Sequence, residues 1–416
     1  MASYVPGDVE ISSLVLEGRD FAENFTKIVT KEHIFAPFVK TLVDVSQYTG
    51  EMGNFDGTRE SSVVFKTPDG LKRRYEKLLT NGLYDVAIDA AERARNFTTQ
   101  FVSKHALINS ATPNFQKAFK NKQISGVIEG ILKDGLGVDL PINIDKTKGL
   151  HGSDDQPIIL TQKSPLRHID DLRRMAISDQ NYDGFLLFSG IGSSGGEELN
   201  FKSIYDMLKK DVVAEITNLS NYEVNSDLGA PIMHNVIEMF MAAGPNQQGS
   251  FKKGAFSKNA TRYDVNKAAF DVPKLVAGKA RQMLGSATSL NPGQVSGFVN
   301  NPFNSMPGTY NVLLEDSRRP DSHRAETAPY TEALFADMMT SFFTIKIPGD
   351  TNLKIGDIIH YSGRENTDNF LNKDTQVYGK HIITGITNYI GPISDRPRFV
   401  TYLDLVNIQS YNGVIS

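Results

Sequence analysis

Short runs of alternating hydrophobic and polar residues occupy the first hundred positions of the chain. They read EISSLVLEG, FVKTLVDVSQ, SSVVFKT, LYDVAID and NFTTQFVS, and turn-forming Gly, Asp and Pro residues separate them. Alternation with a period of two is typical of strands that bury one face. The pattern therefore predicts a small antiparallel sheet or barrel, with hairpin turns at Asp56-Gly57 and Pro68-Asp69-Gly70.

The hydrophobic period becomes that of a helix after residue 110. In QISGVIEGILKDG the apolar residues recur at three- and four-residue spacing, and Gly135 is suited to end the helix. A second helix is predicted at SPLRHIDDLRRMAI, where Ser164 would cap the N-terminus and Pro165 fits the first turn. With strands around residues 184–203, this part of the chain is predicted to be α+β.

The last eighty residues return to the alternating pattern, in SFFTIKIPG, KIGDIIHYS, YGKHIITGITNYI and RFVTYLDLV. Four strands and a second barrel are predicted there. Residues 241–328 differ, because they are rich in Gly, Asn, Ser, Pro and Lys and contain one candidate helix, VPKLVAGKARQML. We expect this region to consist of loops and extensions that become ordered against a partner.

Together these patterns predict a β-rich α+β chain with two antiparallel β-barrel domains and inserted α+β and irregular domains. The first barrel would span residues 1–110 and the α+β middle domain residues 111–205. The second barrel would combine residues 206–240 with 329–412, around the irregular insertion at 241–328. A chain of 416 residues is long enough for several domains with their own cores.

Gly190, Gly192 and Gly195 have the GxGxxG spacing of a dinucleotide-binding loop. Such a loop needs a buried strand before the first glycine and a helix that begins at the third, because the helix N-terminus binds the phosphates. The run FLLF before the glycines fits a strand, but EELNFKS after them alternates like a second strand. The pattern predicts a surface hairpin and no nucleotide site.

Composition narrows the classes of function further. The chain has no cysteine, which excludes disulfides, thiolate nucleophiles and cysteine-based zinc sites. Its formal net charge of −4 is untypical of a dedicated nucleic-acid binder, which needs a basic surface. No apolar run reaches the roughly 20 residues of a membrane helix, and MASYVPGDVE lacks the pattern of a signal peptide. We expect a protein without a membrane anchor that is made and assembled in the cytoplasm.

The sequence HGSDD offers His151, Asp154 and Asp155 as ligands for a metal in a loop. None of the eight histidines has an HxH or HExxH spacing, and Gly, Ser and Asp together are typical of ordinary turns. A turn is therefore the favoured interpretation of this stretch.

His168, Asp170 and Asp171 could form an acid/base group, but this part of the second predicted helix also fits its polar face, which we favour. No GxSxG motif is present, and serines such as Ser189 have no evident His and Asp partners. We therefore predict no catalytic, cofactor-binding or metal-binding residue, no cofactor and no enzymatic activity.

Three stretches in the right order resemble the central baseplate hub protein of contractile-tailed, T-even-type phages. The first is NFTTQFVSKHALINSATPNFQKAFKNKQISGVIEGIL, and the second is NYDGFLLFSG with LNFKSIYDML. The third is IPGDTNLKIGDIIHY with VYGKHIITGITNYI and RFVTYLDLVNIQS. In the third stretch the matching positions are Pro348, Gly349, Asn352, Leu353, Gly356, Asp357, Gly379, Lys380 and Thr384. The resemblance covers about residues 80–205 and 325–410, and none of these motifs is catalytic.

The resemblance implies a homotrimer in which each chain supplies two β-barrel tube domains, so that six barrels form a pseudo-sixfold ring. Such a hub joins the hexameric tail tube proteins to a trimeric cell-puncturing spike or tail lysozyme protein. Baseplate wedge proteins surround the hub. DNA passes through its channel without being bound. The implied location is the tail baseplate of a virion that is assembled in the host cytoplasm.

A hub of a related contractile secretion system or tailocin is the alternative with the same fold. Because the chain ends at Ser416, soon after the second predicted barrel, we expect a separate spike protein, which favours the phage. More distant alternatives are a hydrolase that uses His168 or the 151–155 loop and a carbohydrate-binding protein. The absence of tryptophan weakens the last of these.

Overall fold

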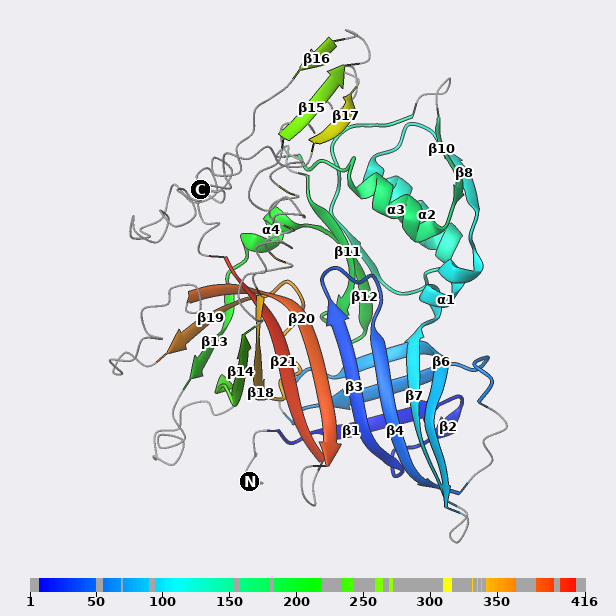
Figure 1. Ribbon diagram of the computed structural model, residues 1–416, viewed down its shortest axis with the longest axis vertical. Helices are drawn as coiled ribbons and strands as arrows, with labels where there is room; N and C mark the ends of the chain where they lie inside the picture. Colours follow the sequence, from blue (N-terminus) through cyan, green and yellow to red (C-terminus); the bar gives the residue numbers. More distant parts are fainter. Residues whose placement is uncertain are drawn as a thin grey trace.

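The protein is described by a computed structural model (Figure 1). The described residues are 7–49, 55–68, 70–89, 94–152, 157–179, 183–218, 234–241, 259–264, 269–271, 310–315, 331, 335, 338, 342–363, 379–392 and 397–408. They form large antiparallel sheets with few helices, which confirms the β-rich α+β fold class. No helix in this part of the chain is long and apolar enough to cross a membrane.

The N-terminal segment consists of strands, as the alternating pattern predicts. They are β1 (Glu10–Leu16), β2 (Arg19–Asp20), β3 (Phe25–His33), β4 (Lys40–Tyr48), β5 (Ser61–Lys66), β6 (Arg73–Asp89) and β7 (Ala94–Ser103). Pro68 and Gly70 lie between the antiparallel strands β5 and β6, so the hairpin predicted there is confirmed. Asp56 and Gly57 form no hairpin turn, because they join β4 to β5 and these two strands pair with other strands.

The middle segment mixes helices and strands. Its elements are α1 (Lys104–Ala111), β8 (Phe115–Phe119), α2 (Ile124–Leu136), β9 (Ile142–Ile144), β10 (Ile158–Lys163), α3 (Pro165–Arg173), β11 (Phe185–Ile191), β12 (Glu197–Ser203) and α4 (Ile204–Leu208). The glycine that ends α2 is Gly137 and not Gly135, because Gly137 takes the left-handed conformation with φ of 59°. Pro165 fills the first turn of α3 as predicted, whereas the side chain of Ser164 makes no capping hydrogen bond.

The C-terminal segment contains the four strands that the alternating pattern predicts. They are β18 (Phe342–Pro348), β19 (Ile358–Gly363), β20 (Gly379–Pro392) and β21 (Pro397–Asn407), and β13 (Val212–Asn218) and β14 (Glu238–Met241) join them. Within residues 241–328, the described part forms a three-stranded sheet of β15 (Asn259–Asp264), β16 (Ala269–Asp271) and β17 (Tyr310–Glu315). The candidate helix VPKLVAGKARQML lies outside the described residues.

The strand-rich ends of the chain meet in one sheet of 13 strands. Its main path runs β14-β18-β21-β20-β3-β4-β7-β6-β5-β1-β2, and β13 and β19 attach to it at β20. The two ends join where β3 pairs antiparallel with β20, from Ile28 opposite Ile390 to His33 opposite Gly385. We call this pairing the seam. Figure 1 shows β3 and β20 side by side in the middle of the molecule.

Three hydrophobic cores lie in the N-terminal, middle and C-terminal parts of the molecule, and β11 contributes to all of them. Phe185 and Leu187 pack in the middle core with α2 and α3. Leu186 and Phe188 pack in the C-terminal core, and Ile191 packs in the N-terminal core. All seven residues of β11 are buried, so the interpretation of the β11–β12 hairpin as a surface hairpin is wrong. A strand that buries both faces gives an unbroken apolar run.

Candidate functional site: a buried junction and an open sheet

Of the glycines of the GxGxxG motif, Gly190 lies in β11, and Gly192 and Gly195 lie in the turn of the β11–β12 hairpin. β11 and β12 pair antiparallel over their whole length, as the alternation predicts, and no helix begins at the third glycine. The turn instead packs on the start of β6, where the Arg74 N–H donates to the Gly195 carbonyl at 2.8 Å. A Cβ atom on Gly195 would lie 1.9 Å from the Lys72 carbonyl oxygen. Gly195 therefore permits a close contact between two backbones.

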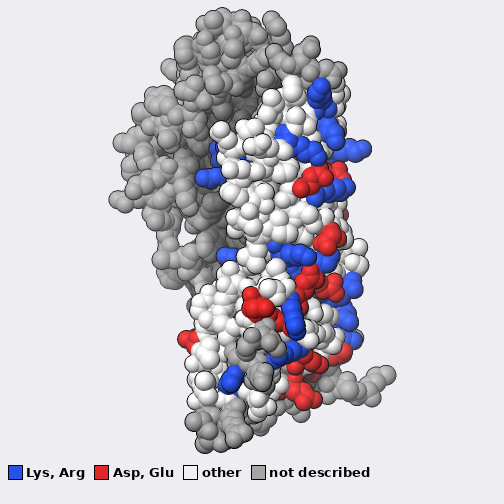
Figure 2. All heavy atoms as spheres, turned by 90° about the vertical axis from the view of Figure 1, so that its right-hand side faces the viewer, with Lys and Arg blue, Asp and Glu red and all other residues white. Residues whose placement is uncertain are grey.

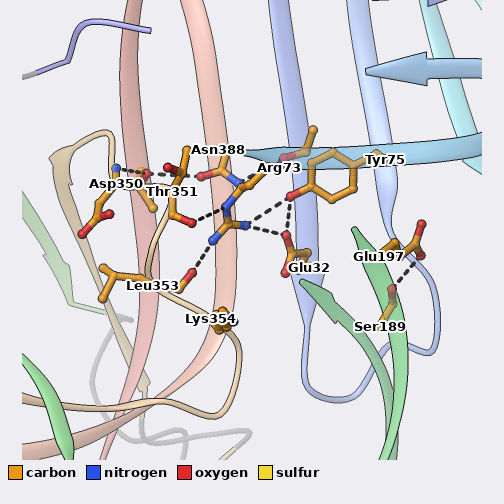
Figure 3. Close-up of polar contacts among 12 residues, drawn as sticks. Glu32, Arg73, Tyr75, Ser189, Glu197, Asp350, Thr351, Leu353, Lys354 and Asn388 are labelled. Atoms are coloured by element: carbon orange, nitrogen blue, oxygen red, sulfur yellow. Dashed lines mark hydrogen bonds and ion pairs between the residues drawn. The ribbon is translucent and has the colours of Figure 1, made fainter. Parts of the chain in front are cut away.

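Beside this contact, Arg73 is fully buried and bridges three parts of the chain (Figure 3). Its Nη1 lies 2.7 Å from Oε1 of Glu32 on β3 and 3.2 Å from the Tyr75 hydroxyl. Its Nε and Nη2 donate to the carbonyl oxygens of Thr351 and Leu353 in the loop after β18. A buried charge needs such partners, because an unpaired charge in the interior costs several kcal/mol.

A second set of hydrogen bonds extends the junction into the seam. The Asn388 side chain on β20 donates to the Thr30 hydroxyl on β3 at 3.2 Å. The Thr401 hydroxyl donates to the Asn388 side-chain oxygen and accepts from the Asp350 N–H, both at 3.2 Å. His234 lies 2.9 Å from the Asp350 carboxylate. These polar residues are thus hydrogen-bonded to one another where the two ends of the chain meet.

Glu197, the first residue of β12, is buried next to this junction. Its Oε1 accepts a hydrogen bond of 2.6 Å from the Ser189 hydroxyl on β11. The pKa of Glu197 is raised to about 7, mainly by burial; the Ser189 hydrogen bond lowers it, and the negative charge of Glu32 raises it. In the described part of the chain, Oε2 of Glu197 and Oε2 of Glu32 have no hydrogen-bond partner. Two buried carboxyl groups are therefore incompletely satisfied.

Of the three residues considered as metal ligands, the structure describes His151 alone. His151 is buried and pairs through its backbone with Lys122, and Asp154 and Asp155 lie outside the described residues. Among the residues that the structure describes, no group of three or more His, Asp or Glu side chains could hold a metal ion.

The placement of His168 on a polar helix face is wrong. The ring is buried, its Nε2 lies 3.3 Å from the Phe115 carbonyl oxygen, and burial lowers the pKa of His168. Asp170 pairs with Arg173 and Asp171 with Lys163 on the surface. The histidine therefore packs α3 against β8 and contacts neither aspartate in the described hydrogen bonds.

Charges of both signs mix on the side of the molecule that includes β8, β10 and α2. Figure 2 shows lysine and arginine side chains interspersed with aspartate and glutamate over this face. Lys117 pairs with Asp134, and Lys77 pairs with Asp139. No continuous basic surface is seen on the described part of this face, and such a surface is what binding to a nucleic-acid backbone requires.

The central strands of the large sheet bury one face and leave the other open. In β18, Phe343, Ile345 and Ile347 are buried, whereas Thr344 and Lys346 between them are partly exposed. Side chains that lie opposite one another follow this open face across six strands. In order, they are Glu238, Lys346, Tyr402, Thr387, Lys31 and Lys40, and none of them is buried. We call this surface the open face.

Charged groups on the open face are partly paired with each other. Lys346 forms an ion pair with Glu238 at 3.3 Å, and Lys27 forms one with Asp44. The Thr344 hydroxyl donates to Asp404 at 2.6 Å. The open face thus presents hydroxyl groups and ion pairs instead of a block of one charge.

The edges of β14 and of the distal part of β6 are among the strand edges that lack a partner among the described residues. β14 pairs with β18 alone, and β6 pairs with β7 alone beyond Leu78, where its pairing with β5 ends. Large apolar side chains are exposed at both edges. They are Tyr84, Val86 and Ile88 on β6, and Ile237 and Phe240 at β14. Unpaired backbone next to exposed apolar side chains is a site for addition of another strand.

Two solved structures of tail proteins have a fold similar to that of this chain. The tail protein from Neisseria meningitidis MC58 is similar with a TM-score of 0.57 and 9% identity, over 98% of this chain and 99% of that chain. The 43 kDa tail protein of prophage MuSo2 from Shewanella oneidensis is similar with a TM-score of 0.51 and 9% identity, over 97% and 98% of the two chains. This chain shares the fold of phage tail proteins.

A component of the Francisella PdpA-VgrG complex has a similar fold as well. The TM-score is 0.52 at 11% identity, over 98% of this chain and 59% of that chain. No protein-family model matches the sequence, and no curated protein is similar to it in sequence. The similarity is thus one of fold.

Proposed function

We propose that the chain is the structural central hub of a contractile phage tail. Three copies would form a ring of six tube domains that joins the hexameric tail tube to a trimeric spike, within surrounding baseplate wedge proteins. The proposal rests mainly on the large sheet, because it carries an open face across its central strands and an unpaired strand edge at each end of them. Such a sheet is complete only when its edges meet those of other chains.

The two edges suit each other as an interface between identical chains. Joining the β6 edge of one copy to the β14 edge of the next would bury Val86 and Ile88 on one side and Phe240 on the other. Repeated around a threefold axis, this head-to-tail contact closes a ring in which both of these edges are paired. We place the first tube domain at residues 1–110 and the second at 206–240 and 329–412, and the α+β middle domain at 111–205.

The open face would line the channel of such a ring. Its lysines are partly neutralised by ion pairs, such as that between Lys346 and Glu238, and hydroxyl groups occupy positions between them. A wall of this kind offers a polyanion few fixed cationic contacts, so DNA would pass without being held. The same assembly places the protein in the tail baseplate of a virion, without an enzymatic role.

A hub of a contractile secretion system or a tailocin is the second candidate. The fold similarity to the Francisella PdpA-VgrG complex favours it, and the proposed ring is the same in both cases. The two candidates differ in the particle that contains the hub. Immunogold labelling of purified particles would separate them, because a phage baseplate belongs to a DNA-filled virion.

The first test is the mass and shape of the purified full chain, alone and with a candidate spike protein. Light scattering is expected to give about three times the chain mass of 46.0 kDa, and averaged electron micrographs are expected to show a threefold ring with a channel. A chain that stays monomeric in the presence of the spike would overturn the proposal.

A variant of the β6 edge makes this test specific. Val86→Lys combined with Ile88→Lys is expected to shift the trimer to monomer, because lysines on a strand edge oppose addition of another strand. The matched control is Ile159→Lys on β10, since Ile159 and Ile88 are each 66% exposed and Ile159 lies away from both edges. Loss of the trimer in the control, or its persistence in the edge variant, would contradict the proposed interface.

A further inference from the structure

Side chains of the β11–β12 hairpin pack in all three hydrophobic cores, near two buried carboxyl groups. Figure 3 shows Glu197 and Ser189 of the hairpin bonded to each other on the side of Glu32 that faces away from Arg73, and Glu197 and Glu32 are both buried. The hairpin turn contacts β6 through the Arg74 N–H and the Gly195 carbonyl. Before this contact along the chain, side chains of β11 pack in the middle core and in the C-terminal core. The position of the middle segment on the large sheet therefore depends on this hairpin.

We propose that the hairpin is a proton-linked latch, in which protonated Glu197 holds it against β3 and β6 and ionised Glu197 loosens it. The proposal does not depend on the hub function. It concerns how firmly the middle segment is attached to the large sheet at a given pH.

Arg73 has no described donor directed at Glu197. Its guanidinium is occupied by Glu32, by the Tyr75 hydroxyl and by two carbonyl oxygens in the loop after β18. Arg74 donates to the Ser194 carbonyl in the hairpin turn. An ionised Glu197 would therefore be a second buried carboxylate, in addition to Glu32, and it would have no described cation as a partner.

Other charged groups around the junction are engaged elsewhere. Asp350 is bonded to His234, and Asp357 accepts from the Lys354 N–H and lies 3.8 Å from Lys210. Tyr75 donates to Glu32, and burial, followed by the negative charge of Glu32, raises the pKa of Tyr75, so it stays neutral in the working range. Glu197 has no charged partner of its own among the described contacts, and burial raises its pKa to about 7.

The direction of the pH effect follows from linkage. The pKa of Glu197 is raised from 4.5 to about 7 in the closed latch, so the closed state binds the proton more tightly than an open, solvated state. Closure therefore weakens as the pH rises from about 4.5 to about 7 and changes little above that range. Between pH 5 and pH 8 the closing equilibrium is expected to fall roughly fiftyfold.

Hydrogen–deuterium exchange of the full-length protein tests the latch. After correction for the pH dependence of intrinsic exchange, protection of residues 186–203 is expected to fall roughly fiftyfold from pH 5 to pH 8 in the wild type. Glu197→Gln, which keeps the shape and cannot ionise, is expected to keep high protection at both values. The same fall in Glu197→Gln, or constant protection in the wild type, would overturn the proposal.

Two further variants and one direct measurement complete the test. Glu198→Gln removes the neighbouring, half-buried carboxyl and is expected to leave the wild-type pH dependence unchanged. Ser189→Ala removes the donor that lowers the pKa of Glu197 and is expected to shift the transition to higher pH. Should Glu197→Gln fail to fold, infrared spectroscopy of the wild type decides, because a protonated buried carboxyl band at pH 6 is required and its absence would overturn the latch.

Discussion

The seam and the open edges belong to the same sheet, but the chain completes the first and leaves the second unpaired. At the seam, β3 and β20 exchange backbone hydrogen bonds, and the Asn388–Thr30 bond and the Arg73 cluster support them. At the outer edges, β14 and the part of β6 beyond Leu78 have one neighbour each among the described strands, and Ile88 and Phe240 are exposed. The difference separates contacts that hold one chain together from contacts that are available to another chain.

The seam is expected to break most severely when Arg73 is replaced. Arg73→Met leaves Glu32 as a buried carboxylate without its cation, so the free energy of unfolding should fall by about 3–5 kcal/mol. Denaturant unfolding followed by circular dichroism measures the loss. Arg174→Met, at a side chain that is 58% exposed, is the control and should change stability by less than about 1 kcal/mol. An equal loss in both variants would show that the cluster does not stabilise the seam.

A pair of isoleucines compares the seam with the edge directly. Ile390→Ala removes a fully buried side chain at the seam and should lower the free energy of unfolding by about 2–5 kcal/mol. Ile88→Ala at the β6 edge should change the stability of the single chain by at most about 0.5 kcal/mol. Thermal unfolding at low protein concentration measures both. A large loss for Ile88→Ala in the monomer would mean that the edge is already covered within the chain.

The smallest expected loss in the free energy of unfolding is for a substitution in the hairpin that lies against the seam. Gly195→Ala places a Cβ against the Lys72 carbonyl oxygen at a φ of 78°, and should cost about 1–3 kcal/mol. Gly126→Ala within α2 is the control, since its Cβ meets nothing within 4 Å, and it should stabilise by about 0.5–1 kcal/mol. Exchange measurements should show faster opening of residues 189–197 in Gly195→Ala. Unchanged protection there would mean that the turn does not need the close contact.

The alternating pattern predicts β20 and its neighbour β21, but it does not predict β3, the other strand of the seam. β20 and β21 were evident because Ile382, Ile386 and Leu403 recur among polar residues and are buried. β3 was not singled out, because its buried face carries Thr30 and Glu32 along with Ile28. Hydrophobic periodicity identifies a strand only when its buried side chains are apolar.

The junction itself could not be inferred from the sequence. Arg73 and Arg74 look like an ordinary basic pair, yet Arg73 is fully buried while Arg74 lies partly exposed at the hairpin turn. The partners of Arg73 come from β3 and from the loop after β18, and no local spacing relates these segments. The prediction that His168 lies on a polar helix face is wrong for a similar reason, because the carbonyl group that it contacts belongs to β8. Buried polar clusters depend on tertiary contacts, which a local pattern does not contain.

The pairing of β3 with β20 also has a consequence for the order in which the chain is made. β3 ends at His33 and its partner β20 begins only at Gly379, so β20 leaves the ribosome with a delay after β3. At typical translation rates this delay is on the order of half a minute. Throughout it, the nascent sheet has an unpaired strand whose backbone groups can bind another nascent chain. We expect β3 to be the segment that chaperones must shield until β20 has been made.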